Sequence, residues 1–326
     1  MPRRLLPSGL ALAVTVTALA TTGCGGPEAT SAGSSSRTSV AAAFYALEYV
    51  VGRVGGDHVD VTGLTKPGLE PHDLELTPRQ VGAVVDADLV VYLKGFQPAV
   101  DDAVGQGEAA KALDASTVVQ MAAEHADGGH EEHAEDEHGG DAGEGAGEHA
   151  HEGAGDPHFW LDPTRVGTFA TAVAKRLAAV DADHAADYTA NAERLGGELA
   201  ALDRDYRDGL RQCERRTFVT SHSAFGYLAE RYYLQQVPIA GLSPEVEPSP
   251  GRLEEVQDVV RSEDVTTIFY ETLTAPDVAE SMARDLGVRT DVLDPVEGIT
   301  DASPGRDYLA VMRANLDALR KANGCA

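Results

Sequence analysis

The chain has 326 residues, enough for two domains of ordinary size, and its 43% hydrophobic and 6% aromatic content is typical of a soluble globular protein. The formal net charge of −27 argues against binding to nucleic acid and against an electrostatic hold on anionic membranes. It is compatible with a partner that is a cation.

The first 24 residues have the features of a targeting segment. Arg3 and Arg4 give a positive start, the mostly apolar stretch 5–20 is too short to span a bilayer, and small residues then lead into Cys24. This order resembles a bacterial lipoprotein signal. We therefore expect a signal peptide over 1–23, lipid on Cys24 that anchors the protein to the outer face of the cell membrane, and a flexible tether over 24–38. Ordinary secretion is the alternative.

Export also bears on the two remaining cysteines, Cys213 and Cys325. Disulfides persist outside the cytoplasm, so we expect these two cysteines to pair. The bond would tie the C-terminal helix to the start of the second domain. Two unrelated buried thiols are the alternative.

Strand and helix patterns alternate through the first part of the chain. Apolar runs predict strands at 39–44, from residue 58 onward and at 88–93, with a further short strand at 117–119. A helix is expected after the first strand, as far as 55–56. Another should start at Thr77, because Thr as N-cap, Pro at the first helical position and Gln80 three residues after the cap mark a helix N-terminus. This alternation predicts a parallel sheet covered by helices on both faces.

After residue 163 the apolar residues recur at helical spacing for about 50 residues. The second helical segment, 185–212, is expected to be an uninterrupted linking helix between domains. Alternation then returns, with strands predicted at 217–220, 235–239, 266–270 and 289–293 and a last helix at 308–323. The predicted fold class is α/β, with two parallel-sheet domains, 39–184 and 213–326, joined by that helix.

The stretch 125–156 is rich in histidine, glycine and acidic residues, with no apolar periodicity that could stabilise an ordered fold. Neutral imidazole is the commonest metal ligand, so this composition favours an auxiliary, low-affinity metal-binding loop. A merely solvated acidic linker is the alternative. The loop histidines are His125, His130, His133, His138, His149 and His151.

Three other histidines lie in strand-end or loop contexts. His158 lies between Pro157 and the only tryptophan, where apolar sequence resumes, whereas His72 and His222 closely follow predicted strands, as does the turn 294–297. Ligands of open α/β sheets bind beyond the carboxyl ends of the strands, so we expect these residues at a cleft between the two domains. His58 and His184 have contexts that favour structural or solvated roles.

Five motifs follow one another along the chain: GLEPHD at 68–73, PHFWLDP at 157–163, TSHSAF at 220–225, GLSPEVEPSP at 241–250 and LDPVE at 293–297. With these motifs in this order, the chain resembles the zinc-binding solute-binding lipoproteins of metal ABC transporters, the ZnuA-like members of cluster A-I. The resemblance runs from about residue 39 to the C-terminus. It implies two α/β domains joined by one long helix, with the metal between them.

The resemblance places the family's three histidine ligands on His72, His158 and His222. It favours Glu297 as the fourth ligand, with Asp294 as the alternative. Glu271 is another nearby candidate, and some relatives use water in this position. Manganese-binding relatives carry a carboxylate where His222 stands, and three imidazoles with one carboxylate favour Zn²⁺ over Mn²⁺. Imidazole also suits Cu²⁺ and Ni²⁺.

The function implied is extracytoplasmic capture of Zn²⁺ and its delivery to an ABC transporter permease driven by a cytoplasmic ATPase. The protein is expected to be a monomer, not an enzyme, and to bind no nucleic acid. The alternatives are a manganese or other divalent-metal binding protein of the same family, a secreted zinc hydrolase, and a surface adhesin or metal buffer. No HExxH pair is present to support the hydrolase.

Overall fold

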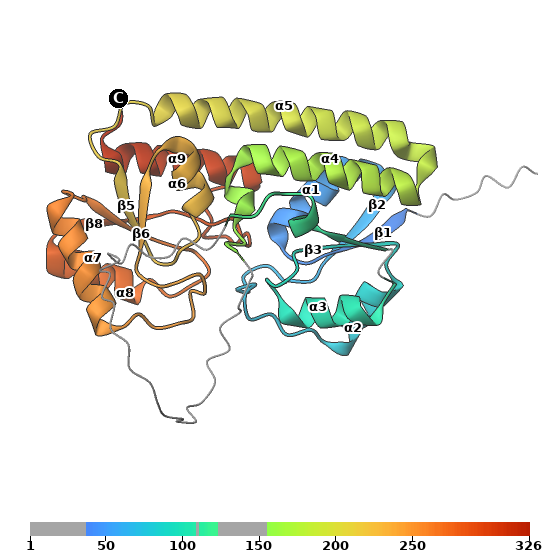
Figure 1. Cartoon of the computed structure of the whole chain (residues 1–326), viewed down its shortest axis with the longest axis horizontal. Coiled ribbons are helices and arrows are strands. Elements are labelled where there is room, and N and C mark those ends of the chain that lie inside the picture. The colour runs from blue at the N-terminus through green and yellow to red at the C-terminus, as the bar shows by residue number, and fades with distance from the viewer. Residues whose placement is uncertain (1–36, 109–110, 123–154) are drawn as a thin grey trace, which may run out of the picture. The chain divides into compact units, whose positions relative to one another are not determined.

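The computed structural model describes residues 37–108, 111–122 and 155–326, and Arg37–Ala326 form one compact unit. This unit contains two four-stranded parallel sheets, whose strand orders are β2-β1-β3-β4 and β6-β5-β7-β8 (Figure 1). In each sheet the first strand lies between the second and the third, so the strand order reverses beside it. Such a reversal opens a crevice at the carboxyl ends of the strands. The α/β class with two parallel sheets is confirmed.

The first sheet is built from four short strands that alternate with helices, and residues 64–77 form a loop between the second strand and the helix after it. Its helix α2 begins as the sequence predicts, because Thr77 and Gln80 form a reciprocal capping box with Pro78 in the first turn. The elements are β1 (Thr38–Ala42), α1 (Tyr45–Gly55), β2 (Val59–Gly63), α2 (Pro78–Asp86), β3 (Leu89–Tyr92), α3 (Pro98–Gln106) and β4 (Ala112–Asp114).

The short strand predicted at 117–119 is wrong. The fourth strand of the sheet lies earlier, at Ala112–Asp114, where it pairs with β3. The Asp114 carboxylate then accepts a hydrogen bond from the Ser116 backbone at 2.9 Å, which turns the chain into a 3-10 helix over Ala115–Thr117. A side chain that bonds its own backbone in this way competes with strand formation despite the β-branched residues nearby.

The helical stretch after residue 163 consists of α4 (Pro163–Val180) and α5 (Ala185–Gly209). Between them the Asp181 carboxylate accepts hydrogen bonds from His184 at 2.7 Å and Tyr188 at 2.5 Å, which stabilises a tight turn. The long helix α5 packs along α4, α1 and the last helix, α9 (Tyr308–Asn323) (Figure 1). It ends three residues before the predicted end. None of the helices in the described ranges combines the length and apolar character that a membrane span requires.

The second sheet repeats the first in topology, and its strands lie close to the predicted positions. Its helices α6 and α9 pack with the first sheet's elements into one large hydrophobic core, while α7 and α8 cover a smaller one. The elements are β5 (Thr217–Thr220), α6 (Gly226–Tyr232), β6 (Gln235–Pro238), α7 (Pro250–Ser262), β7 (Thr267–Tyr270), α8 (Asp277–Leu286), β8 (Arg289–Val292) and α9 (Tyr308–Asn323).

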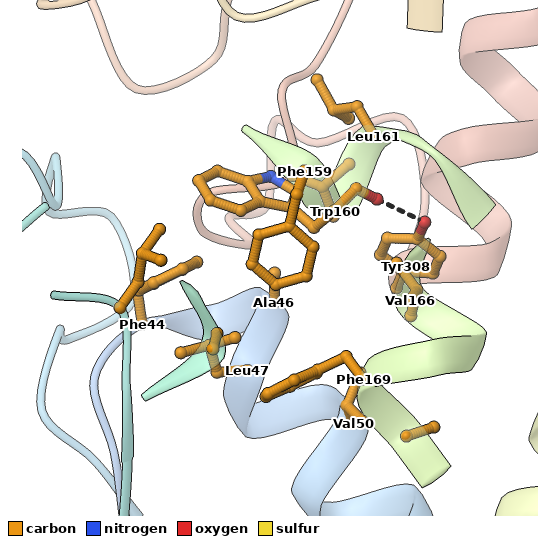
Figure 2. Packing of buried hydrophobic residues seen from close by; sticks show 14 of the residues in the cluster. Phe44, Ala46, Leu47, Val50, Phe159, Trp160, Leu161, Val166, Phe169 and Tyr308 are labelled. Carbon is orange, nitrogen blue, oxygen red and sulfur yellow. Dashed lines mark hydrogen bonds between the residues drawn. The ribbon is translucent and has the colours of Figure 1, made fainter. Parts of the chain in front are cut away.

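The aromatic segment after His158 is embedded in the large core. Figure 2 shows Phe159 and Trp160 near Phe44 and the buried residues of α1. The Trp160 ring lies 4.7 Å from the Phe44 ring, and its Nε1 donates to the Pro295 carbonyl at 2.8 Å. The Tyr308 hydroxyl donates to the Trp160 carbonyl at 2.6 Å. This segment is therefore held by both halves of the chain, and it fixes the position of the histidine before it.

Candidate metal centre

Four side chains from four separate segments meet at one point. His72 lies in the loop between β2 and α2, and His158 immediately precedes the 3-10 turn Phe159–Leu161. His222 follows β5 by two residues, and Glu297 lies in the turn after β8. One potential ligand atom from each of these residues lies within 4.8 Å of all the others. The structure thus brings together the four residues that the sequence singled out.

The carboxylate of Glu297 is at the centre of this group. Its Oε1 lies 3.1 Å from Nε2 of His158, 3.4 Å from Nε2 of His72 and 3.6 Å from Nε2 of His222. The side chains of His158, His222 and Glu297 are at most 1% exposed, whereas that of His72 is 10% exposed.

These four atoms are buried and have no hydrogen-bond partner within the described part of the chain. Leaving one buried polar atom unpaired costs free energy, and native proteins rarely do so without a reason. A cation that takes all four as ligands provides that reason. Three imidazole nitrogens and one carboxylate oxygen are a donor set that fits tetrahedral Zn²⁺.

Two of the histidines are oriented by buried carboxylates. Nδ1 of His158 donates to Asp156 at 2.8 Å, and Nδ1 of His222 donates to Glu271 at 2.5 Å. In the neutral ring that binds a metal, a proton on Nδ1 leaves the lone pair on Nε2, the nitrogen that faces the cluster. Carboxylates in this supporting position also raise the basicity of a ligating imidazole.

Sequence reasoning missed the supporting roles of Asp156 and Glu271. The sequence places Asp156 at the end of the His-rich loop and makes Glu271 a nearby candidate ligand. Glu271 instead follows β7, the strand beside β5, so it meets His222 where the strand order reverses. No motif in the sequence reports this contact, because it depends on which strands lie side by side in the second sheet.

The alternative ligand Asp294 lies outside the four-residue group. Its Oδ1 accepts from the Val296 backbone at 2.8 Å, and its Oδ2 accepts from Thr272 at 3.0 Å. The buried amide of Asn315 holds the Asp294 backbone through two further hydrogen bonds. Asp294 thus shapes the turn that carries Glu297.

This turn also contains a strained backbone position. Val296 has a φ of 60° and is completely buried. A β-branched residue is strained in this left-handed region, so the contacts around Val296 must hold its backbone in this unfavourable conformation. The turn therefore directs the next residue, Glu297, towards the histidines.

The protonation equilibria of the cluster are strongly perturbed. Burial alone would lower the pKa of His222, but Glu271 raises it to about 10. Burial opposes the charged form of His158 as well, and Asp156 and Glu297 nevertheless raise its pKa. Burial lowers the pKa of His72. For Glu297, burial would raise the pKa, but the three imidazoles hold it well below its ordinary value, so this carboxylate is anionic.

Several other predicted residues are placed away from this cluster or outside the described ranges. His58 and His184 stack on each other with ring centroids 3.8 Å apart, and each contacts an aspartate, His58 contacting Asp187 and His184 contacting Asp181. These contacts agree with a structural role. Cys24 and the six loop histidines lie outside the described residues.

The predicted disulfide joins Cys213 and Cys325, which are 112 residues apart in sequence. Cys213 lies just after α5 and Cys325 just after α9. The bond therefore ties the chain's last residues to the segment that leads into β5, as expected from the sequence.

A family model described as the periplasmic component A of the zinc-uptake complex, ZnuA, matches residues 40–322. The high-affinity zinc uptake system protein ZnuA of Bacillus subtilis is 34% identical over 287 residues, which cover 86% of each chain. The zinc-binding lipoprotein AdcA of Streptococcus pneumoniae is 32% identical over 87% of this chain, which spans only 56% of that relative.

Solved structures give the same result for the fold. The Zn(II)-bound ZnuA-like domain of Streptococcus pneumoniae AdcA superposes with a TM-score of 0.70 at 30% identity, covering 88% of this chain and 99% of that one. A laminin-binding protein of Streptococcus agalactiae, titled a bifunctional protein with adhesin and metal transporting activity, gives a TM-score of 0.74 at 31% identity, with coverage of 88% and 99%. The chain belongs to the ZnuA family of zinc-uptake components.

Proposed function

We propose that this protein captures Zn²⁺ outside the cytoplasm as the binding component of a zinc-uptake system. The observation that carries the proposal is the convergence of three imidazole nitrogens and one carboxylate oxygen, buried and without hydrogen-bond partners among the described residues. The ligands are His72, His158, His222 and Glu297. The zinc functions in the names of its relatives support the same assignment.

The donor set favours zinc over manganese. Mn²⁺ prefers oxygen ligands, whereas three imidazoles with one carboxylate suit Zn²⁺. His222 is the residue on which this preference depends, because a carboxylate in its place would give two nitrogens and two oxygens. We expect His222→Glu to shift selectivity from zinc towards manganese, measured as the ratio of the two dissociation constants.

The same donor set favours transport over catalysis. Catalytic zinc keeps an open position for water beside three protein ligands, whereas here Glu297 Oε1 lies 3.1–3.6 Å from all three imidazoles. A carboxylate in the fourth position leaves no activated water. Stoichiometric zinc binding without turnover of ester, peptide or phosphate substrates is the expected result, and measurable hydrolysis would contradict it.

We further propose that the protein delivers zinc to a membrane permease driven by a cytoplasmic ATPase, and that it acts as a monomer held to the outer face of the membrane by lipid on Cys24. The lipoprotein relative supports the anchor. In this proposal the sheet of β1–β4 and the sheet of β5–β8 belong to two α/β domains, and each domain supplies two of the four ligands. Growth of a deletion strain under zinc chelation separates uptake from adhesion, because a pure adhesin would leave zinc uptake intact.

Metal analysis of the purified protein tests the binding function. One tight equivalent of zinc is expected, together with weaker equivalents from the His-rich loop, whose ligands must lose conformational entropy on binding. Deleting 126–155 should lower the total zinc content and retain the tight equivalent. Loss of the tight equivalent would show that the loop belongs to the primary site.

A further inference from the structure

The four proposed ligands differ in how much solvent reaches them. Three are almost completely buried, and only the side chain of His72 retains measurable exposure, at 10%. Among the described residues, the edge of the cluster formed by His72 is therefore the one nearest to solvent. An ion that enters or leaves must pass this edge unless the buried core opens.

A carboxylate that the proposed site does not use lies at the same edge. Glu70 has a side chain that is 12% exposed, and its Oε1 lies 3.9 Å from Nε2 of His72. Its other oxygen, Oε2, accepts a hydrogen bond from the backbone N–H of His72 at 2.8 Å. That bond fixes the orientation of the carboxylate and leaves Oε1 free. Oε1 is buried, and no group in the described residues donates to it.

The loop that carries Glu70 and His72 lies at the boundary with solvent. Leu69 is 50% exposed, whereas the histidine three residues later reaches the cluster. The loop also approaches the segment after Glu297, since a Cβ added at Gly298 would lie 3.9 Å from the backbone oxygen of Leu69. The Glu70 carboxyl group thus lies at the same partly exposed edge of the cluster as His72.

We propose that Glu70 is an entry ligand for the cation that this site binds. With His72 it takes the incoming divalent ion from solvent, and the ion then passes to the three buried ligands. A carboxyl oxygen with no other partner can replace one of the waters of a hydrated cation. Glu70 stands outside the group of four converging atoms, so it acts during passage and does not hold the bound ion. This inference rests on the proposed function, because it assumes that the cluster binds zinc.

The test is the kinetics of zinc binding to the whole protein and to Glu70→Gln. The amide oxygen of the variant can still accept the bond from the His72 backbone, so the loop should keep its conformation. Trp160, the only tryptophan, lies 5.2 Å from the His158 ring and offers a fluorescence signal for mixing with Zn²⁺ and for release to excess chelator. We expect both rates to fall by the same factor, on the order of tenfold, with an unchanged dissociation constant, because an entry ligand stabilises only the state between free and bound ion.

Matched variants separate this role from a general effect of losing a carboxyl group in the loop. Asp73→Asn makes the same carboxyl-to-amide change at an exposed position in the same loop and should leave both rates close to wild type. Glu70→Asp keeps the carboxyl group on a shorter side chain and should give intermediate rates. Unchanged kinetics of Glu70→Gln would overturn the inference, as would equal slowing by Asp73→Asn. A weaker dissociation constant with faster release would also overturn it, because Glu70 would then be a ligand of the bound ion. If wild-type protein binds no tight zinc, it is the proposed function that fails.

Discussion

The metal centre has two unlike sides. On the buried side, His158 and His222 are fully enclosed, and each donates its Nδ1 proton to a carboxylate. On the other side, His72 is partly exposed, and Glu70 bonds its backbone rather than its ring. The proposed ligands on the buried side are held in a fixed orientation by their carboxylates, which favours tight binding. The proposed ligand on the open side can exchange with water, which favours loading and release.

This asymmetry should appear most clearly when single ligands are removed. A structural zinc site with four ligands binds with about 10–16 kcal/mol, so the loss of one ligand should weaken binding on the order of a hundredfold or more. We expect larger losses for His158→Ala and His222→Ala than for His72→Ala, since water can more easily replace the partly exposed ligand. Glu297→Ala should cost less than any histidine, because three imidazoles still hold the ion.

Competition titrations with a calibrated zinc chelator measure these differences. Wild-type affinity of His158→Ala would contradict the whole site. If Glu271→Ala abolishes binding while Glu297→Ala leaves it unchanged, the carboxylate ligand is Glu271 and the present assignment is wrong. Asp294→Asn provides a further control for the turn. We expect it to weaken binding only through the position of Glu297.

Removing the supporting carboxylates should give the next largest effect. Asp156→Asn and Glu271→Gln keep the size of the side chain but lose the charge that orients His158 and His222. Each should weaken zinc binding by about 10–100-fold. The exposed Asp73→Asn serves as a matched control and should retain wild-type affinity. If all three variants bind zinc with equal affinity, the carboxylates of Asp156 and Glu271 do not contribute to zinc binding.

The two sides should also differ in their response to pH. Zinc binds neutral imidazole, and the pKa of His222 in the metal-free protein is about 10, so binding at pH 7.5 must displace its proton. His72, whose pKa is lowered by burial, has no proton to release there. Calorimetry at pH 7.5 in buffers of different ionisation heat should detect at least one proton released per zinc. A binding heat independent of buffer would contradict this.

The sign of the stability effect follows from the same raised pKa. Because the folded-state pKa of His222 lies above its ordinary value of 6.5, the protonated ring stabilises the metal-free fold fully below about pH 6.5. That contribution is lost as the pH rises towards 10. The thermal midpoint of the metal-free protein should therefore fall as the pH rises from about 6.5 towards 10. Over the same range, the increase in thermal midpoint on adding zinc should become larger.

The disulfide should have the smallest effect on zinc binding. It lies after α5 and α9 and includes no residue of the cluster. Replacing both Cys213 and Cys325 by alanine should lower the free energy of unfolding by about 2–5 kcal/mol. Zinc affinity should stay close to wild type in the same variant. A large loss of zinc affinity in a variant that remains folded would show that the disulfide helps to position the proposed ligands.

Much of this architecture could be predicted from the sequence because its signals are local. The capping box at Thr77 and the final helix at 308–323 were correctly located. The misplaced strand shows the limit of such signals, since the side chain of Asp114 turns the chain just where β-branched residues follow. The interruption at Asp181 likewise depends on hydrogen bonds to specific neighbours.

For the metal centre, the four proposed ligands were predicted through resemblance to a family and through their positions after strands. The supporting carboxylates could not be predicted from the sequence in this way. Glu271 reaches His222 only because β7 lies beside β5, and Asp156 belongs to the folded segment rather than to the His-rich loop. The entry position of Glu70 depends on exposure, which no motif reports.

The most direct test of the central claim is a crystal structure of the zinc-loaded protein with anomalous diffraction at the zinc edge. We predict one strong peak bound by Nε2 of His72, His158 and His222 at roughly 2.0–2.1 Å and by Glu297 at roughly 2.0–2.2 Å, with Asp156 and Glu271 still bonded to Nδ1 of their histidines. A strong peak that lies on Asp294 or Glu271, or that lacks any of the three imidazoles, would contradict the account.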